Sequence, residues 1–197
     1  MHILLLYGTS EGQTRKIAGY VAERLRAAGH DVLLRDVLRL DPPVHAADFD
    51  AVIIAARVHA GRYQRQIVAF ARINRTALER IPNAFLSVSM SAARLTGGDE
   101  ARLARYVNRF ITRSGWRPEH VLHVAGARLY LRHNFIGRAI LRLIDGNRFD
   151  VRQNHEWTDW QALDAFAAGF DASLRNVAVP SRLEAAFDHQ PPTIGHH

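Results

Sequence analysis

The chain of 197 residues contains no cysteine. This absence excludes disulfides, thiolate metal sites, iron–sulfur clusters and a cysteine nucleophile, so any redox function has to rest on a bound organic cofactor. No apolar run approaches the ~20 residues that a membrane-spanning helix needs. With 48% hydrophobic and 23% charged residues, the composition excludes a mainly disordered chain and fits one globular domain.

Lysine is nearly absent, because Lys16 is the only lysine among 26 basic residues. The net charge is +7, and its excess is concentrated: residues 101–150 carry ten basic and three acidic side chains. Such a patch suits nucleic acid, anionic lipid or a small anion. The apolar start, residues 1–7, lacks a basic leader and a small-residue cleavage site, so we expect a cytoplasmic protein.

Short apolar runs alternate with amphipathic helical patterns. Strands are expected at Ile3–Tyr7, Asp31–Asp36, Ala51–Ala56, Ala84–Val88 and Val121–Ala125. Helices are expected between the loop Gly8–Gln13 and Gly29, over about Gln64–Arg80, over about Asp99–Ser114, and from a cap at Thr158 or Asp159. The alternation predicts an α/β fold, with helices on both faces of a parallel sheet.

Two segments lie outside this alternation. An insert of about residues 128–156 separates the fifth strand from the last helix. Residues 178–197 contain three prolines, and we expect them to form a flexible tail after one domain of residues 1–177.

The loop after the first strand carries the strongest local signal. Thr9, Ser10 and Thr14 supply hydroxyl groups where a helix begins, and Gly12 lets the backbone approach an anion closely. This pattern favours a phosphate site, and an ordinary polar turn is the alternative. Neither the Walker A spacing nor the dinucleotide GxGxxG pattern is present, which disfavours ATP, GTP and NAD in their usual modes.

The spacing of Thr9, Gly12 and Thr14 resembles the phosphate loop of flavodoxins. The resemblance implies FMN as the cofactor and a doubly wound, five-stranded parallel sheet of order 2-1-3-4-5. Glu11 departs from common flavodoxins, and we expect its carboxylate to point outward or to cap the helix. The residues that the resemblance assigns to FMN, in this loop and in those after the third and fourth strands, are Thr9, Ser10, Glu11, Gly12, Gln13, Thr14, Arg57, Val58, His59, Gly61, Ser87, Val88, Ser89, Met90, Ser91 and Ala92.

Five further motifs are spread over the chain: Glu11-Gly12-Gln13-Thr14, Ser87-Val88-Ser89, Trp116-Arg117-Pro118, Ala125-Gly126-Ala127 and Trp157-Thr158-Asp159-Trp160. Their order and spacing resemble those of the menaquinone-dependent protoporphyrinogen oxidase family over about residues 1–175. This resemblance implies FMN-dependent oxidation of protoporphyrinogen IX to protoporphyrin IX with a quinone as electron acceptor. An electron carrier of the flavodoxin type and an NAD(P)H:quinone reductase are the alternatives. No catalytic acid or base is assigned.

The insert is basic and amphipathic, with a helix expected over Phe135–Asp145. One interpretation is a helix that docks on the domain with solvated arginines outside. The other is a surface for propionate groups or for an anionic membrane at the inner face of the cell membrane. The residues assigned to that surface are Arg128, Tyr130, Arg132, Arg138 and Arg142.

Other partners are less favoured by the sequence. No carboxylate near His120 and His123 completes a metal site, so no metal is expected. The interleaving of aromatic and basic residues that is typical of RNA-binding proteins is missing, which disfavours nucleic acid. The sequence leaves open the oligomeric state, including a homo-oligomer, and the physiological electron acceptor.

Overall fold

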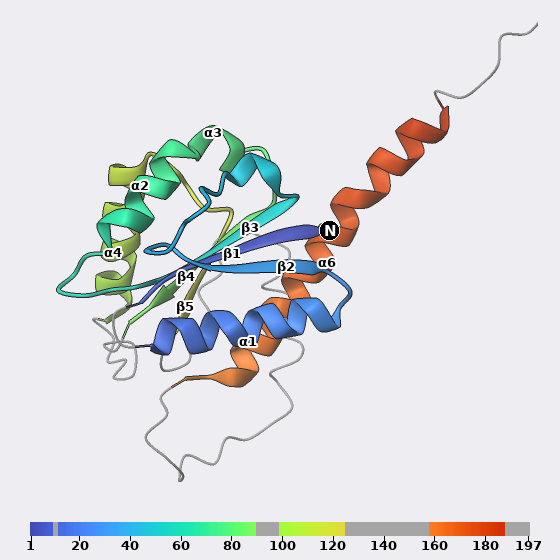
Figure 1. The fold of residues 1–197 in the computed structure, drawn as a ribbon. Helices are drawn as coiled ribbons and strands as arrows, with labels where there is room; N and C mark the ends of the chain where they lie inside the picture. Colours follow the sequence, from blue (N-terminus) through green and yellow to red (C-terminus); the bar gives the residue numbers. More distant parts are fainter. Residues whose placement is uncertain (10–11, 90–98, 125–157, 188–197) are drawn as a thin grey trace, which may run out of the picture.

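The computed structural model describes residues 1–9, 12–89, 99–124 and 158–187, with only the backbone for 99 and 177–187. Its centre is one five-stranded sheet of parallel strands in the order β2-β1-β3-β4-β5 (Figure 1). The strands are β1 (His2–Gly8), β2 (Asp31–Asp36), β3 (Ala51–Arg57), β4 (Asn83–Val88) and β5 (His120–Val124). The predicted parallel sheet and its strand order are therefore confirmed.

Helices cover both faces of this sheet, as predicted. The helices of the described residues are α1 (Gln13–Ala27), the short 3-10 helix η1 (Ala46–Asp48), α2 (Arg65–Ile73), α3 (Arg75–Leu78), α4 (Asp99–Ser114) and α6 (Trp160–Phe187). Helices α1 and α6 pack on one face, and α2, α3 and α4 lie on the other (Figure 1). The strands carry apolar side chains on both sides because both sides are covered.

Glycine ends α1 as predicted. Gly29 has φ +93°, its N–H donates to Arg26 O, and the N–H of His30 donates to Leu25 O. These two hydrogen bonds define a Schellman motif, in which a residue without a side chain most easily adopts the left-handed conformation. The chain then enters β2 at Asp31, where the sequence pattern placed it.

The structure differs from the sequence pattern at two helices. The single helix expected over about Gln64–Arg80 is divided at Asn74 into α2 and α3. The buried Asn74 amide donates to Phe70 O and accepts from the N–H of Ala46, which ties the break to η1. The last helix extends past Pro180 to Phe187, into the segment where we expected the tail. The flexibility of that tail stays a prediction.

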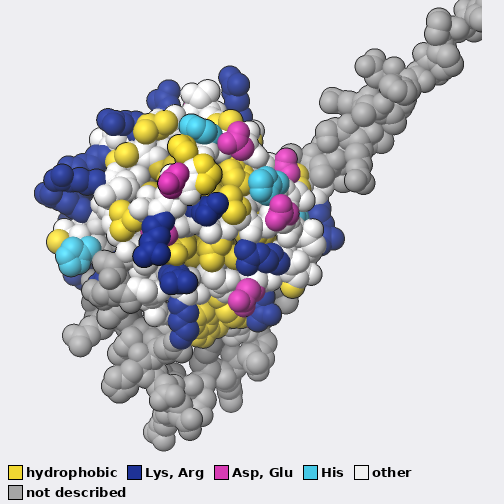
Figure 2. Space-filling model, in the orientation of Figure 1, with side chains coloured by type: hydrophobic (Ala, Val, Ile, Leu, Met, Phe, Trp, Pro, Cys, Tyr) yellow, Lys and Arg dark blue, Asp and Glu magenta, His cyan; other side chains and the backbone are white. Residues whose placement is uncertain are grey.

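The surface of the described residues is rich in arginine. On the face that Figure 2 shows, Lys and Arg side chains are spread over the helices and the edge strand β2, with fewer Asp and Glu side chains between them. No helix among the described residues combines the length and apolar character needed to cross a bilayer.

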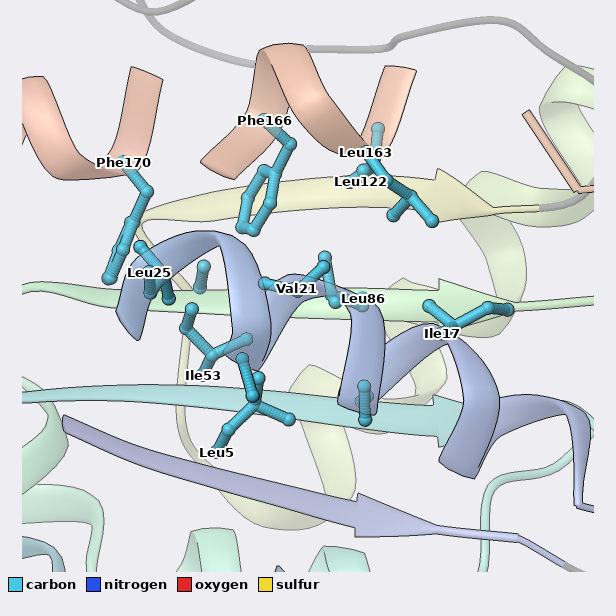
Figure 3. Close-up of a cluster of buried hydrophobic side chains, with 14 of the residues drawn as sticks. Leu5, Ile17, Val21, Leu25, Ile53, Leu86, Leu122, Leu163, Phe166 and Phe170 are labelled. Atoms are coloured by element: carbon cyan, nitrogen blue, oxygen red, sulfur yellow. The ribbon is translucent and has the colours of Figure 1, made fainter. Parts of the chain in front are cut away.

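The core between the sheet and its first helical layer joins four strands to two helices. Leu5, Ile53, Leu86 and Leu122 point from β1, β3, β4 and β5 toward side chains of α1 and α6 (Figure 3). Those side chains are Ile17, Val21, Leu25, Leu163, Phe166 and Phe170, all of which are buried. Each such burial contributes about 1.5–3 kcal/mol, so the strand ends are held on a rigid frame.

Candidate cofactor site

The carboxyl ends of the strands meet at one edge of the sheet, and the loops that follow them are tied together. The N–H of Val58, after β3, donates to Val88 O at 2.8 Å, and the N–H of Ser89, after β4, donates to Val124 O at 3.0 Å. This edge is where open parallel sheets bind ligands. The structure therefore brings two of the three loops predicted to bind a cofactor side by side.

The third loop leads from β1 into α1. Gly12 has φ +84°, and its N–H donates to Thr9 Oγ1 at 2.9 Å. Thr9 accepts this bond through its oxygen, which leaves its hydroxyl hydrogen for another acceptor. Because Gly12 adopts a left-handed conformation, the sequence needs glycine here. Ser10 and Glu11 lie outside the described residues.

The first turn of α1 is suited to an anion. No side chain of the described residues caps it and it contains no acidic residue, whereas Arg15 and Lys16 both lie in it. The N–H groups of an uncapped helix start need acceptors, and the helix dipole favours a negative charge there. Cations in this turn oppose the dipole by themselves but are compatible with a bound phosphate.

The buried hydroxyl of Thr14 shows whether the residues present fit a phosphate. The Thr14 side chain is completely buried, and its Oγ1 has no hydrogen-bond partner within the described part of the chain. A buried hydroxyl without a partner costs about 1–3 kcal/mol, so native proteins rarely keep one. A phosphate oxygen at the start of α1 would accept this hydrogen bond, and the residues present fit such a group.

The side chain of Gln13 is hydrogen-bonded within the protein. Its Nε2 donates to Thr158 Oγ1 at 2.6 Å, just before α6. Asp159 Oδ1 accepts from the N–H of Ala162, so Asp159 caps α6, and Thr158 anchors the loop after β1 through Gln13. The side chain of Gln13 thus links the start of α1 to the residues before α6, and its backbone N–H is one of the groups at the helix start that lack an intrahelical partner.

The loop after β3 is a tight turn. His59 and Arg62 exchange two backbone hydrogen bonds, and the residues between them have positive φ, +47° for Ala60 and +71° for Gly61. Two successive positive φ values are typical of a type I′ turn, in which glycine is favoured. The side chain of His59 is exposed, whereas that of Val58 is half-buried in the core. Arg57 is the last residue of β3.

The loop after β4 begins with buried residues. The Ser87 hydroxyl is hydrogen-bonded to Tyr63 Oη at 2.8 Å. Burial raises the pKa of the Tyr63 phenol well above its usual range, although the bond to Ser87 acts in the opposite direction. The side chain of Val88 lies in the core, and Ser89 is also buried. Met90, Ser91 and Ala92 lie outside the described residues.

Two residues at this edge were not singled out by the sequence for binding a cofactor. Among the described residues, Gln64 Oε1 and His123 Nδ1 are buried without a hydrogen-bond partner. His123 pairs in register with Ser87 of β4. Burial lowers the pKa of His123 to about 4, so its imidazole is neutral at pH 7. Neither residue belongs to a motif, and the signal that reveals them is an unpaired buried atom.

The remaining predicted residues are Arg128, Tyr130, Arg132, Arg138 and Arg142, which lie outside the described residues together with the insert. Within the ranges that the structure describes, no three His, Asp or Glu side chains are grouped closely enough to hold a metal ion.

A parallel sheet of this strand order, followed after β1 by a loop and a helix start suited to an anion, is typical of a class of cofactor-binding domain. The chain belongs to the flavodoxin domain family, whose model matches residues 4–155. The flavodoxin domain indicates FMN as the cofactor. This agrees with the fit of a phosphate to Thr14 and to the uncapped start of α1.

Curated relatives give a narrower resemblance. The protoporphyrinogen IX dehydrogenase [quinone] of Escherichia coli strain K12 is 32% identical over 170 residues, which cover 85% of this chain and 93% of the relative. A protein of the same name from Leishmania major is 30% identical over 196 residues, 97% of this chain and 83% of the relative. The resemblance to the protoporphyrinogen oxidase family is therefore confirmed.

Solved structures agree with the fold. A flavodoxin from Streptococcus pneumoniae has a TM-score of 0.53 at 16% identity, covering 88% of this chain and 99% of the other. A short-chain flavodoxin associated with a bacterial microcompartment has a TM-score of 0.54 at 13% identity, covering 88% and 99%. At these identities, the likeness shows the fold alone.

Proposed function

We propose that this protein is an FMN-dependent oxidoreductase that oxidises protoporphyrinogen IX to protoporphyrin IX and delivers the electrons to a quinone. The observation that carries the proposal is the 32% identity to a protoporphyrinogen IX dehydrogenase [quinone], because it extends over 85% of this chain and 93% of the relative. The buried Thr14 hydroxyl, which lacks a partner among the described residues, supports the binding of FMN on structural grounds alone.

The chain's own residues would hold the cofactor in two places. Thr9, Gly12 and Thr14, with Ser10 and Glu11 between them in sequence, would bind the phosphate through hydroxyl and backbone N–H groups. The loops after β3 and β4, residues 57–61 and 87–92, would hold the flavin ring. When bound, FMN supplies a group that accepts hydride equivalents and releases electrons, whereas the protein supplies orientation and electrostatics.

The substrate side of the proposal rests on the basic insert. Arg128, Tyr130, Arg132, Arg138 and Arg142 would bind the propionates of the porphyrinogen or an anionic membrane surface, because guanidinium groups pair with carboxylates bidentately. In this proposal the protein lies in the cytoplasm and contacts the inner face of the membrane that carries the quinone through this basic surface.

The experiment starts from the visible spectrum of the purified protein. We expect a flavin band, with release of FMN on denaturation. Anaerobic addition of protoporphyrinogen IX and a soluble naphthoquinone should then produce protoporphyrin IX, measured by its fluorescence. Reactions without protein and with free FMN at the same concentration are the controls, because the substrate also oxidises without enzyme.

Each alternative predicts a different result. An FMN protein that transfers electrons but does not oxidise protoporphyrinogen above the free-FMN rate would be an electron carrier. One that instead oxidises NAD(P)H with the quinone would be a quinone reductase. A colourless protein that FMN does not titrate would contradict both halves of the proposal.

A further inference from the structure

Gln64, the residue before α2, directs its side chain away from its own helix. It makes no capping hydrogen bond to the start of α2. Instead, its amide lies against Gly8, the last residue of β1, where a Cβ would overlap Gln64 Oε1 and come within 2.9 Å of Ile67 Cγ1. Glycine at position 8 therefore leaves the space that the Gln64 amide fills.

The amide gains no partner in that space. Gln64 Oε1 is buried and has no hydrogen-bond partner among the residues that the structure describes. A buried acceptor without a donor is costly, and native proteins keep such atoms chiefly where a ligand or a bound water supplies the donor. Because the same side chain does not cap α2, the N–H groups at the start of that helix also lack an acceptor from it, which adds to the cost in stability.

The position of Gly8 indicates which ligand group is near. Gly8 pairs with Ala56 of β3, so it lies between the loop that begins α1 and the loop that follows β3. A cofactor with its phosphate at Gly12–Thr14 and its ring at the loops after β3 and β4 crosses the end of β1. In FMN, the group that joins phosphate to ring is the ribityl chain, whose hydroxyls are hydrogen-bond donors.

We propose that Gln64 Oε1 accepts a hydrogen bond from a ribityl hydroxyl of the bound flavin. The inference rests on the FMN cofactor of the proposed function. Gln64 is then a cofactor-binding residue that selects flavins with a polyhydroxyl chain, independently of the phosphate contacts at Thr14. Gly8 serves the same contact because any side chain there displaces the amide.

The test measures how three flavins bind to the apoprotein and to two variants. FMN, riboflavin and lumiflavin share the ring, riboflavin lacks the phosphate, and lumiflavin lacks both the phosphate and the ribityl chain. Gln64→Met keeps the length of the side chain and removes the acceptor. Gln66→Met makes the same chemical change at an exposed position of α2 and is the matched control.

We expect Gln64→Met to weaken the binding of FMN and of riboflavin by the same factor, about five- to tenfold for one lost neutral hydrogen bond. Lumiflavin should bind to Gln64→Met as it does to the unchanged protein, and Gln66→Met should change none of the three. The melting temperature of apo-Gln64→Met should stay the same or rise, because the variant removes an unpaired buried polar atom.

Other patterns overturn the proposal. An equal loss for all three flavins would place the amide at the ring, and a loss for FMN alone would place it at the phosphate. No loss for any flavin, or a lower melting temperature of the apoprotein that accounts for the weaker binding, would make Gln64 a purely structural residue. A protein that binds FMN but does not oxidise protoporphyrinogen would contradict the proposed function and leave this inference standing.

Discussion

Among the described residues, the two buried side-chain oxygens without a hydrogen-bond partner both lie at the carboxyl edge of the sheet, whereas some unpaired buried nitrogens, such as Trp116 Nε1, lie elsewhere. Away from that edge, Asn83 donates to Leu78 O and Ile81 O and accepts from the N–H of Glu119. At the edge, Thr14 and Gln64 keep buried oxygens without partners. Because an unpaired buried oxygen is costly, its retention at this edge is best explained by a ligand that supplies the missing bonds.

The first prediction concerns Thr14. Thr14→Val removes a hydroxyl that is buried without a partner, so the apoprotein should be as stable as before or slightly more stable. FMN binding should weaken by about 1.5–3 kcal/mol, the usual value of a hydrogen bond to a charged group. The double variant Thr9→Val/Thr14→Val should lose more of its affinity for FMN. Riboflavin, which has no phosphate, should bind unchanged. Flavin titration followed by fluorescence measures the affinities for FMN and riboflavin, and urea unfolding measures the stability of the apoprotein.

Thr112→Val is the control, because the Thr112 hydroxyl donates to Asn108 O on the exposed side of α4. If Thr14→Val and Thr112→Val retain FMN equally well, the loop after β1 is an ordinary polar turn rather than a phosphate site.

The second prediction concerns pH and His123. Burial lowers the pKa of His123 from 6.5 to about 4, so the unfolded chain takes up a proton at a higher pH than the folded protein does. Stability should therefore fall as the pH drops from about 6.5 to about 4. Between pH 7 and pH 5, this one group should reduce the free energy of unfolding by about 2 kcal/mol.

Urea unfolding of the unchanged protein and of His123→Gln at these two pH values measures this contribution. The variant should lose less stability on acidification, although His120, whose pKa burial also lowers, keeps part of the effect. His45→Gln changes an exposed histidine and should retain the full pH dependence. Parallel pH curves for unchanged protein and His123→Gln would show that His123 is not buried as a neutral group.

At the scale of elements, the sequence predicts the regular parts of the fold best. The bounds of β2 and α4 agree with the sequence pattern, because apolar periodicity and flanking polar residues mark them. The break between α2 and α3 was missed. Asn74 is acceptable in a helix by propensity, and the contact that favours the break, with the N–H of Ala46, joins residues far apart in sequence.

In the candidate site, too, features set by the local sequence were predictable and features set by distant contacts were not. The motif at Thr9, Gly12 and Thr14 was predictable from sequence because its spacing and its place after a strand are local features. The tie between Gln13 and Thr158 and the contact of Gln64 with Gly8 were not predictable. Both depend on how distant elements pack, and only the folded chain shows which polar atoms are left without partners.

At the scale of the whole molecule, charge is distributed unevenly along the chain. Residues 101–150 hold ten basic and three acidic side chains, whereas residues 151–197 hold three basic and six acidic ones. The described surface carries Lys and Arg side chains of its own (Figure 2). A test of the insert therefore has to separate the position of the positive charges from their number.

The last prediction makes that separation. Changing Arg128, Arg132, Arg138 and Arg142 together to Gln removes four positive charges from the insert and keeps its length and helix propensity. If these side chains bind propionates or anionic lipid, protoporphyrinogen–quinone activity should fall at least about tenfold, which corresponds to ~1.4 kcal/mol. Binding to vesicles with anionic lipid should fall as well, because each cation near such a surface contributes ~1 kcal/mol.

The matched control changes four exposed arginines of the described helical region, Arg72, Arg80, Arg105 and Arg113, to Gln. It removes the same net charge from a different part of the chain, so long-range attraction weakens equally while the insert stays intact. FMN content should be unchanged in both variants, because the phosphate contacts belong to the loop after β1. Equal activity of the two variants would assign the insert a structural role and favour a flavodoxin-type electron carrier over an enzyme that binds its substrate through arginine.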